Sequence, residues 1–272
     1  MPLRGVTAAY VAAVAAGIVW LWLAGAPQTY ALVNGAATIV GLVAAVILRR
    51  VPARALELFG LVLAALAMAA AIMVGPGVDG VHRWLEIGPL RLHTAALFGP
   101  LFLIAYLRRA DWTGTAAALV VAALAALQPD MSFALALVLS ISLALFFDFR
   151  PLRLVALAGS AGALLFTANR PDGLQPVPFV ENVLQDALSS GGLPAILLPA
   201  ALAVAIAAPL FLPVERRAEG AAVSGWFLAL TAASLLAPFP TPLIGYGAAP
   251  IIGYGIAIGL LGHMPAAGSK RI

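Results

Sequence analysis

The chain has 272 residues, of which 63% are hydrophobic and only 10% are charged. Its mean hydropathy is +1.06, and a soluble domain of this length cannot bury so much apolar surface. The chain contains no cysteine, which excludes disulfides and thiolate metal sites. The formal net charge of +4 comes from arginines near the ends of apolar runs, so it gives no reason to expect a nucleic-acid partner.

Apolar runs long enough to cross a bilayer, about 17 to 25 residues each, recur along the whole chain. They predict an all-α, polytopic helical membrane protein with about ten transmembrane helices. No stretch is left over for a soluble domain, so residues 1–272 are predicted to form a single transmembrane domain. The runs lie near residues 7–25, 30–48, 55–75, 92–107, 113–127, 131–147, 152–168, 193–212, 221–237 and 243–262.

Basic residues are distributed unevenly between the two sides of the predicted bundle. Short loops rich in Lys and Arg remain on the cytoplasmic side of a membrane. With ten spans, twelve of the fifteen Lys and Arg residues fall on the side of the N-terminus. The other side holds Arg83, Arg91 and Arg170. The pattern therefore predicts that both termini are cytoplasmic.

Three segments on the predicted outer face have unusual sequences. Residues 77–92 read GVDGVHRWLEIGPLRL, residues 128–130 read QPD, and residues 238–250 read PFPTPLIGYGAAP. Proline and glycine at membrane depth leave backbone groups without helical partners, which is tolerated where protein or a water-filled cavity satisfies them. We therefore expect the three segments to line one cavity.

The same segments carry the pattern G-x-x-R-W-L-x-I-G-x-x-R-L, then L-Q-P-D, then P-x-P-L-I-x-Y-G. In this pattern the chain resembles the SEDS family of shape, elongation, division and sporulation proteins, over essentially its whole length. The resemblance implies a protein of the bacterial inner membrane that polymerises the lipid-linked precursor lipid II beside a class B penicillin-binding protein. The substrate-binding residues that it implies are Arg83, Trp84, Gln128, Asp130 and Tyr246.

The implied reaction needs few parts. A carboxylate must accept a proton from a sugar hydroxyl, and an arginine or a divalent cation must neutralise the pyrophosphate leaving group. We expect Arg83 to meet that pyrophosphate. No resident cofactor is expected, although a divalent cation could accompany the pyrophosphate.

The chain departs from the family where the chemistry is concentrated. A glutamate and a lysine that follow the first family motif are replaced here by Ala96 and Gly99. In the loop before the eighth span, Pro178 stands where the family has its catalytic aspartate. Proline cannot accept a proton, so Asp172 and Glu181 are the candidates for a relocated base.

Several of these residues also have structural interpretations. Asp130 precedes the sixth span and is a good candidate for its N-cap. Arg83 and Arg91 could pair with Asp79 and Glu86, or with lipid phosphates. The outer loop at 169–192 is predicted to contain a short amphipathic helix that follows Pro178 and ends at the glycines 191–192.

Three functions remain open from the sequence. The first is a catalytically degenerate SEDS-like protein of cell-envelope assembly that binds a lipid-linked precursor, a partner, or both. The second is an active peptidoglycan glycosyltransferase with a relocated base. The third is a lipid flippase or transporter, which would require ionisable residues in mid-span facing a pathway.

Overall fold

The structure is a computed structural model that describes residues 1–88, 90–109, 111–170 and 173–263. Asp172 therefore lies outside the described residues. The described chain forms ten long helices and one short one, α8, which confirms the predicted all-α, polytopic architecture. The long helices are α1 (Leu3–Leu23), α2 (Gln28–Leu48), α3 (Ala53–Val74), α4 (Thr94–Arg108), α5 (Trp112–Leu127), α6 (Met131–Phe147), α7 (Pro151–Ala168), α9 (Pro194–Ala207), α10 (Arg217–Leu236) and α11 (Ala248–Leu261).

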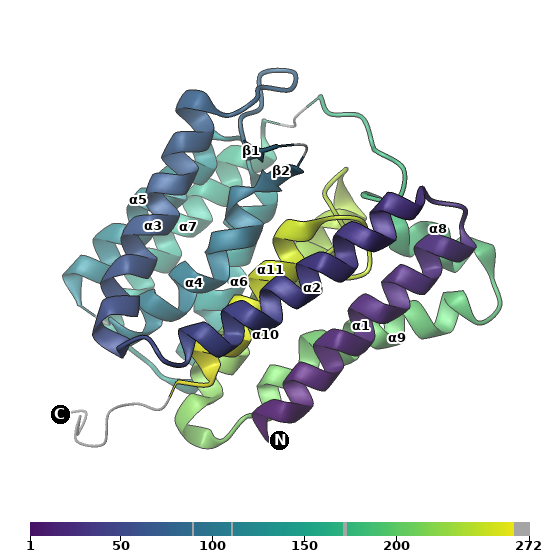
Figure 1. Ribbon diagram of the computed structural model, residues 1–272. Coiled ribbons are helices and arrows are strands. Elements are labelled where there is room, and N and C mark those ends of the chain that lie inside the picture. The colour runs from purple at the N-terminus through teal and green to yellow at the C-terminus, as the bar shows by residue number, and fades with distance from the viewer. Residues whose placement is uncertain (89, 110, 171–172, 264–272) are drawn as a thin grey trace.

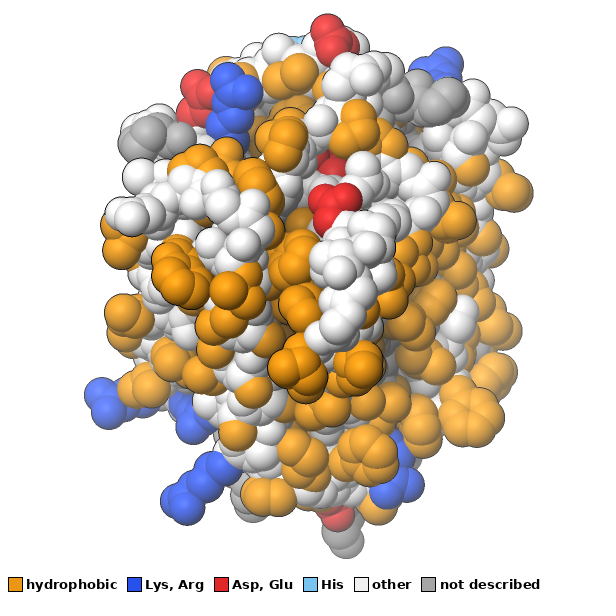
Figure 2. Space-filling model, turned by 90° about the vertical axis from the view of Figure 1, so that its right-hand side faces the viewer, with side chains coloured by type: hydrophobic (Ala, Val, Ile, Leu, Met, Phe, Trp, Pro, Cys, Tyr) orange, Lys and Arg blue, Asp and Glu red, His pale blue; other side chains and the backbone are white. Residues whose placement is uncertain are grey.

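The helices differ in how readily length and hydropathy identify them as membrane spans. In the described residues, six helical stretches are at least 18 residues long and apolar enough to cross a bilayer. Helices α4, α5, α6 and α11 are apolar but have only 14 to 17 residues. Figure 2 shows apolar side chains covering the middle of one face, with charged side chains gathered towards its two ends. That distribution is typical of a lipid-facing surface.

The helices pack in three groups (Figure 1). Helices α3, α5 and α7 lie at one side and α1, α8 and α9 at the other, with α2, α4, α6, α10 and α11 between them. The closest pairs are α6 with α10 and α2 with α11. Small residues allow α2 and α11 to approach each other closely, because a Cβ on Gly255 would lie only 2.4 Å from the Cα of Gly41. Close backbone approach of this kind is how helices gain van der Waals contact inside a membrane.

A β-hairpin precedes α4, where the sequence had suggested only a loop. Strands β1 (Trp84–Ile87) and β2 (Leu90–His93) pair antiparallel, with Trp84 opposite His93 and Glu86 opposite Arg91. Gly88 has a φ of +58°, which suits the turn between the strands. The predicted fourth span began at residue 92, whereas α4 begins at Thr94 because the preceding residues belong to the hairpin.

The segment before α9 contains the short helix α8 (Val183–Ser190), whose buried face is formed by Val183, Leu184 and Ala187. The helix ends at Gly191, but it does not follow Pro178 directly. Phe179 and Asn182 have φ values of +67° and +62°, which a right-handed helix cannot include. The prediction of its start was wrong because this segment makes its hydrogen bonds to another loop.

Candidate functional site

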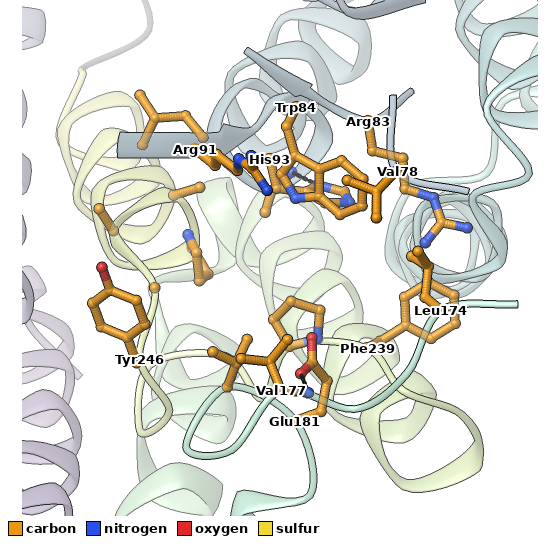
Figure 3. A pocket seen from close by; sticks show the side chains of 18 of the residues that line it. Val78, Arg83, Trp84, Arg91, His93, Leu174, Val177, Glu181, Phe239 and Tyr246 are labelled. Atoms are coloured by element: carbon orange, nitrogen blue, oxygen red, sulfur yellow. Dashed lines mark hydrogen bonds between the residues drawn. The ribbon is translucent and has the colours of Figure 1, made fainter. Parts of the chain in front are cut away.

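A cavity of about 740 Å³ opens between the hairpin, residues 174–181 and the loop from α10 to α11 (Figure 3). Its volume falls within the range of small-molecule sites, about 300 to 1,000 Å³. Two of the three segments expected to line it do so, while of the α5–α6 region only Ser132 reaches it. The residues labelled in Figure 3 are Val78, Arg83, Trp84, Arg91, His93, Leu174, Val177, Glu181, Phe239 and Tyr246.

Arg83 lies in the wall of this cavity with only 1% of its surface exposed. Its Nε donates to the carbonyl oxygen of Gln128 at 3.2 Å, and its Nη2 donates to that of Pro129. The guanidinium also lies 5.0 Å from the centre of the Phe239 ring. One side chain therefore joins the hairpin, the α5–α6 loop and the α10–α11 loop. These contacts give Arg83 a structural role, and its contact with a pyrophosphate stays a prediction.

Asp130 is the N-cap of α6, as the sequence predicted. Its Oδ1 accepts from the backbone N–H of Phe133 at 3.1 Å and from the Ser132 hydroxyl at 2.7 Å. Its Oδ2 lies 3.3 Å from Nε2 of His93. Burial alone would raise the pKa of Asp130, but His93, the charge of Arg83 and the Ser132 hydroxyl outweigh it and hold the pKa below its usual range. Asp130 therefore caps α6 and joins it to the hairpin through His93.

His93 connects the hairpin to two helices. Its Nδ1 accepts from the backbone N–H of Ala96 and so caps α4. An accepting Nδ1 places the ring proton on Nε2, which faces Asp130. Gln128 extends the same buried layer, since its Nε2 donates to the carbonyl oxygen of Met68 on α3 at 3.0 Å. Gln128 and Asp130 thus support the cavity from behind and do not line it.

Trp84 and Tyr246 both line the cavity. The Trp84 ring lies edge-to-face with His93, with 6.1 Å between ring centres. Tyr246 stacks on Tyr30 of α2, with 3.7 Å between ring centres and 9° between the planes. Of the five expected substrate-binding residues, Arg83, Trp84 and Tyr246 line the cavity, whereas Gln128 and Asp130 do not.

Glu181 is the candidate base that the structure describes. It lines the cavity and is half-buried, and its Oε2 accepts from the backbone N–H of Val177 at 2.6 Å. Figure 3 shows its carboxylate on the cavity side of the 174–181 segment. Pro178, at the family's aspartate position, is not among the lining residues.

Arg91 is a cavity residue that the sequence reasoning left as a surface charge. Its side chain is 59% exposed, and it pairs with Glu86 across the hairpin at 2.8 Å. An exposed pair of this kind contributes about 0 to 1 kcal/mol, so a stronger anion can replace it. The pairing of Arg91 with Glu86 confirms one of the two structural interpretations given to Arg91 from the sequence, and it follows from the two residues lying opposite each other on the paired strands.

The charges around the cavity do not add up to a strongly positive site. Among the described lining residues the acids are Asp79, Glu86 and Glu181, and the arginines are Arg83 and Arg91. Within those parts of the chain, no three His, Asp or Glu side chains come together in a way that could hold a metal ion. A divalent cation at this site would therefore have to be bound largely by a phosphorylated ligand.

This architecture is similar to that of a known protein. RodA, the rod-shape-determining protein of Thermus thermophilus, superimposes with a TM-score of 0.74 and 21% identity, covering 94% of this chain and 94% of that one. The chain has the fold of RodA. A mutant of the same protein matches with a TM-score of 0.74 and 21% identity, over 94% of this chain and 95% of that chain.

A third structure, described as the structural coordination of polymerization and crosslinking by a peptidoglycan synthase complex, contains a chain with a TM-score of 0.67 and 21% identity. The match covers 95% of this chain and 96% of that one. No protein-family profile matches the sequence, and no curated protein sequence does so. The likeness to RodA confirms the predicted SEDS resemblance at the level of the fold.

Within this RodA-like fold, the surroundings of Gly99 are tightly packed; the family that the sequence resembles has a lysine at this position. A Cβ on Gly99 would lie 1.9 Å from a ring carbon of Trp226, which is fully buried on α10. Ala96 lines the cavity nearby, and its carbonyl oxygen lies 2.2 Å from where a Cβ on Gly253 would be. The two replacements are thus part of a close-packed region, and a longer side chain at residue 99 requires Trp226 to move.

Proposed function

We propose that this protein is a SEDS-type membrane protein of peptidoglycan synthesis that binds a polyprenyl-linked saccharide precursor, such as lipid II, without polymerising it by the family's usual route. The observation that carries the proposal is the cavity between the hairpin and the two outer loops. It combines an exposed arginine, two aromatic side chains and an apolar wall, which suit a phosphate, a sugar and a lipid chain respectively. The RodA-like fold supports the same assignment.

Arg91 is the residue proposed to contact the phosphate groups. It is exposed in the cavity, whereas the guanidinium of Arg83 is buried against backbone carbonyl groups. Trp84 and Tyr246 would contact the sugar rings. The polymerisation step lacks its usual parts, because Ala96, Gly99 and Pro178 replace the family's carboxylates and amine.

An active glycosyltransferase is the second candidate, and one observation favours it. The carboxylate of Glu181 lies on the cavity side of its segment and could accept a proton from a sugar hydroxyl. A flippase or transporter has less support. In the described long helices, Arg, Asp and Glu occur only within the first five residues or at the last one.

Partner and orientation follow from the same proposal. A class B penicillin-binding protein is the proposed partner, since one matching chain comes from a peptidoglycan synthase complex. The cavity would open on the outer face of the bacterial inner membrane, with both termini in the cytoplasm. The arginine-rich ends of α3, α4, α7 and α10 would then lie on the inner side, as the positive-inside rule requires.

The decisive experiment measures binding and product together. Purified protein in lipid nanodiscs should bind lipid II, and Arg91→Ala should weaken binding by about tenfold, since one charge-assisted contact is worth about 1.5 to 3 kcal/mol. Arg170→Ala is the control, because Arg170 stacks on Phe166 and is not a lining residue. Absence of binding by the wild type would refute the proposal.

Glycan synthesis is assayed in the same samples, with and without the candidate penicillin-binding protein. We expect little or no polymer, because loss of a general base typically costs about a hundred- to ten-thousand-fold in rate. Robust polymer that disappears in Glu181→Ala or Asp172→Ala would establish the second candidate instead.

A further inference from the structure

Helix α2 carries a fully buried asparagine in an otherwise apolar span. Asn34 shares the buried face of the helix with Ala37, Gly41 and Ala45. A buried amide is costly unless its groups are hydrogen-bonded. Both of its groups are satisfied by one loop: Nδ2 donates to the carbonyl oxygen of Gly245 at 2.9 Å, and Oδ1 accepts from the N–H of Gly247 at 3.2 Å.

These two hydrogen bonds pair backbone groups of the α10–α11 loop that regular secondary structure does not pair. The loop contains Pro238, Pro240 and Pro242, so much of its backbone cannot pair in regular structure. Gly247 is the N-cap of α11 and has no side chain with which to cap the helix. Asn34 accepts from the N–H of this N-cap residue, so it satisfies one of the unpaired backbone donors at the start of α11 from a different helix.

The residue between the two bonds is Tyr246, which lines the cavity. Its ring stacks on Tyr30, four residues before Asn34 and so on the same side of α2. The backbone on both sides of Tyr246 and the face of its ring are thus held by one helix. We call Tyr30 and Asn34 together the α2 clamp.

The clamp also reaches the segment that carries Glu181. The N–H of Tyr246 donates to the carbonyl oxygen of Phe179 at 2.7 Å, and that of Thr241 donates to Val180 at 2.9 Å. The clamped loop is therefore bonded directly to the residues before Glu181. A shift of the loop would move two walls of the cavity together.

We propose that Asn34 is a positioning residue for the cavity: with Tyr30, it fixes Tyr246, and through Tyr246 the Glu181 segment, in the arrangement that binds the ligand. This inference rests on the proposed function for its ligand. Asn34 does not line the cavity and acts through Tyr246. Its helix is held against α11 by the close approach of Gly41 and Gly255, so the anchor itself is rigid.

The first test is a substitution that keeps the shape of the side chain. Asn34→Leu removes both bonds, and we expect it to weaken lipid II binding in nanodiscs by about tenfold, the effect of one to two buried hydrogen bonds. Thr38→Val is the matched control: the Thr38 hydroxyl donates one turn back to the Asn34 carbonyl oxygen at 2.8 Å and also interacts with Tyr10 of α1, and neither partner belongs to the α10–α11 loop. If Asn34→Leu fails to fold, Tyr30→Leu removes the other arm of the clamp at a half-buried position and should act in the same direction.

A double-mutant cycle separates positioning from general stability. In a Tyr246→Ala background, Asn34→Leu should cost less than twofold in binding, because its target is gone. In an Arg91→Ala background, Asn34→Leu should weaken lipid II binding by the same factor as in the wild type. Equal losses in both backgrounds would overturn the inference.

Hydrogen exchange tests the clamp without any ligand. The non-proline amides of residues 238–247 should exchange about tenfold faster in Asn34→Leu than in the wild type, because exchange follows local opening. Their exchange rates should be unchanged in Thr38→Val. If the wild type binds no lipid II, the proposed function fails, and this measurement still decides the clamp. Unchanged exchange in Asn34→Leu would refute it.

Discussion

Replacement of Arg83 by alanine should destabilise the part of the protein around the cavity. The change removes two hydrogen bonds from a charged donor and a contact with the Phe239 ring. Such hydrogen bonds contribute about 1.5 to 3 kcal/mol each, and a cation–π contact adds about 0.5 to 2 kcal/mol. Burying a guanidinium itself costs several kcal/mol, so we expect a net loss of about 3 to 5 kcal/mol, as when one partner of a buried charged pair is removed.

The assay is thermal stability of the detergent-solubilised protein, read as the fraction that remains monodisperse after heating. Arg91→Ala is the control, because its exposed pair with Glu86 should contribute about 0 to 1 kcal/mol. Arg83→Met keeps much of the side-chain volume and isolates the loss of the charge and hydrogen bonds. If Arg83→Ala were as stable as Arg91→Ala, the structural role given to Arg83 would be wrong.

Three further predictions concern other parts of the structure. Gly99→Lys should abolish stable expression because of Trp226, and expression should recover when Trp226→Ala is added. The pKa of Asp130 is lowered in the fold, so its contribution to stability is present above its unfolded pKa of about 3.9 and disappears as the pH falls through the folded value. The stability advantage of the wild type over Asp130→Asn should therefore shrink below about pH 5. Single cysteines at Asp79 and Arg109 should react with impermeant maleimide from outside and inside respectively, without background because the chain has no cysteine; reversed labelling would contradict the orientation.

Much of the fold could be predicted because apolar runs in a membrane protein map directly onto helices. The exceptions are segments whose shape depends on distant partners. The hairpin has only four residues in each strand, too few to stand out beside an apolar run. Residues 178–182 have a helical pattern, but the carbonyl groups of Phe179 and Val180 accept from the α10–α11 loop, and those contacts exclude the helix there. In this second segment, tertiary hydrogen bonds override local propensity.

The candidate site was predicted in composition but less well in arrangement. The sequence identified Arg83, Asp130 and Tyr246 as residues of one outer region, and all three lie in or beside the cavity wall. It could not tell which side chains face inward, since that depends on packing between elements far apart in the chain. Asn34 was missed because a lone asparagine in an apolar run carries no motif, and its partners lie more than 200 residues away.

The contact between Gly99 and Trp226 bears on how this chain can evolve. Introducing a lysine at residue 99 requires a second change at Trp226, and either change alone is expected to destabilise the protein. A lysine beside Trp226 is overpacked, while removal of Trp226 first would leave a void that costs about 3 to 5 kcal/mol. Both single-step routes pass through a poorly folded protein that selection would remove. The family that the sequence resembles has a lysine at this position, and the packing of Trp226 makes a change from glycine to lysine here depend on a second change.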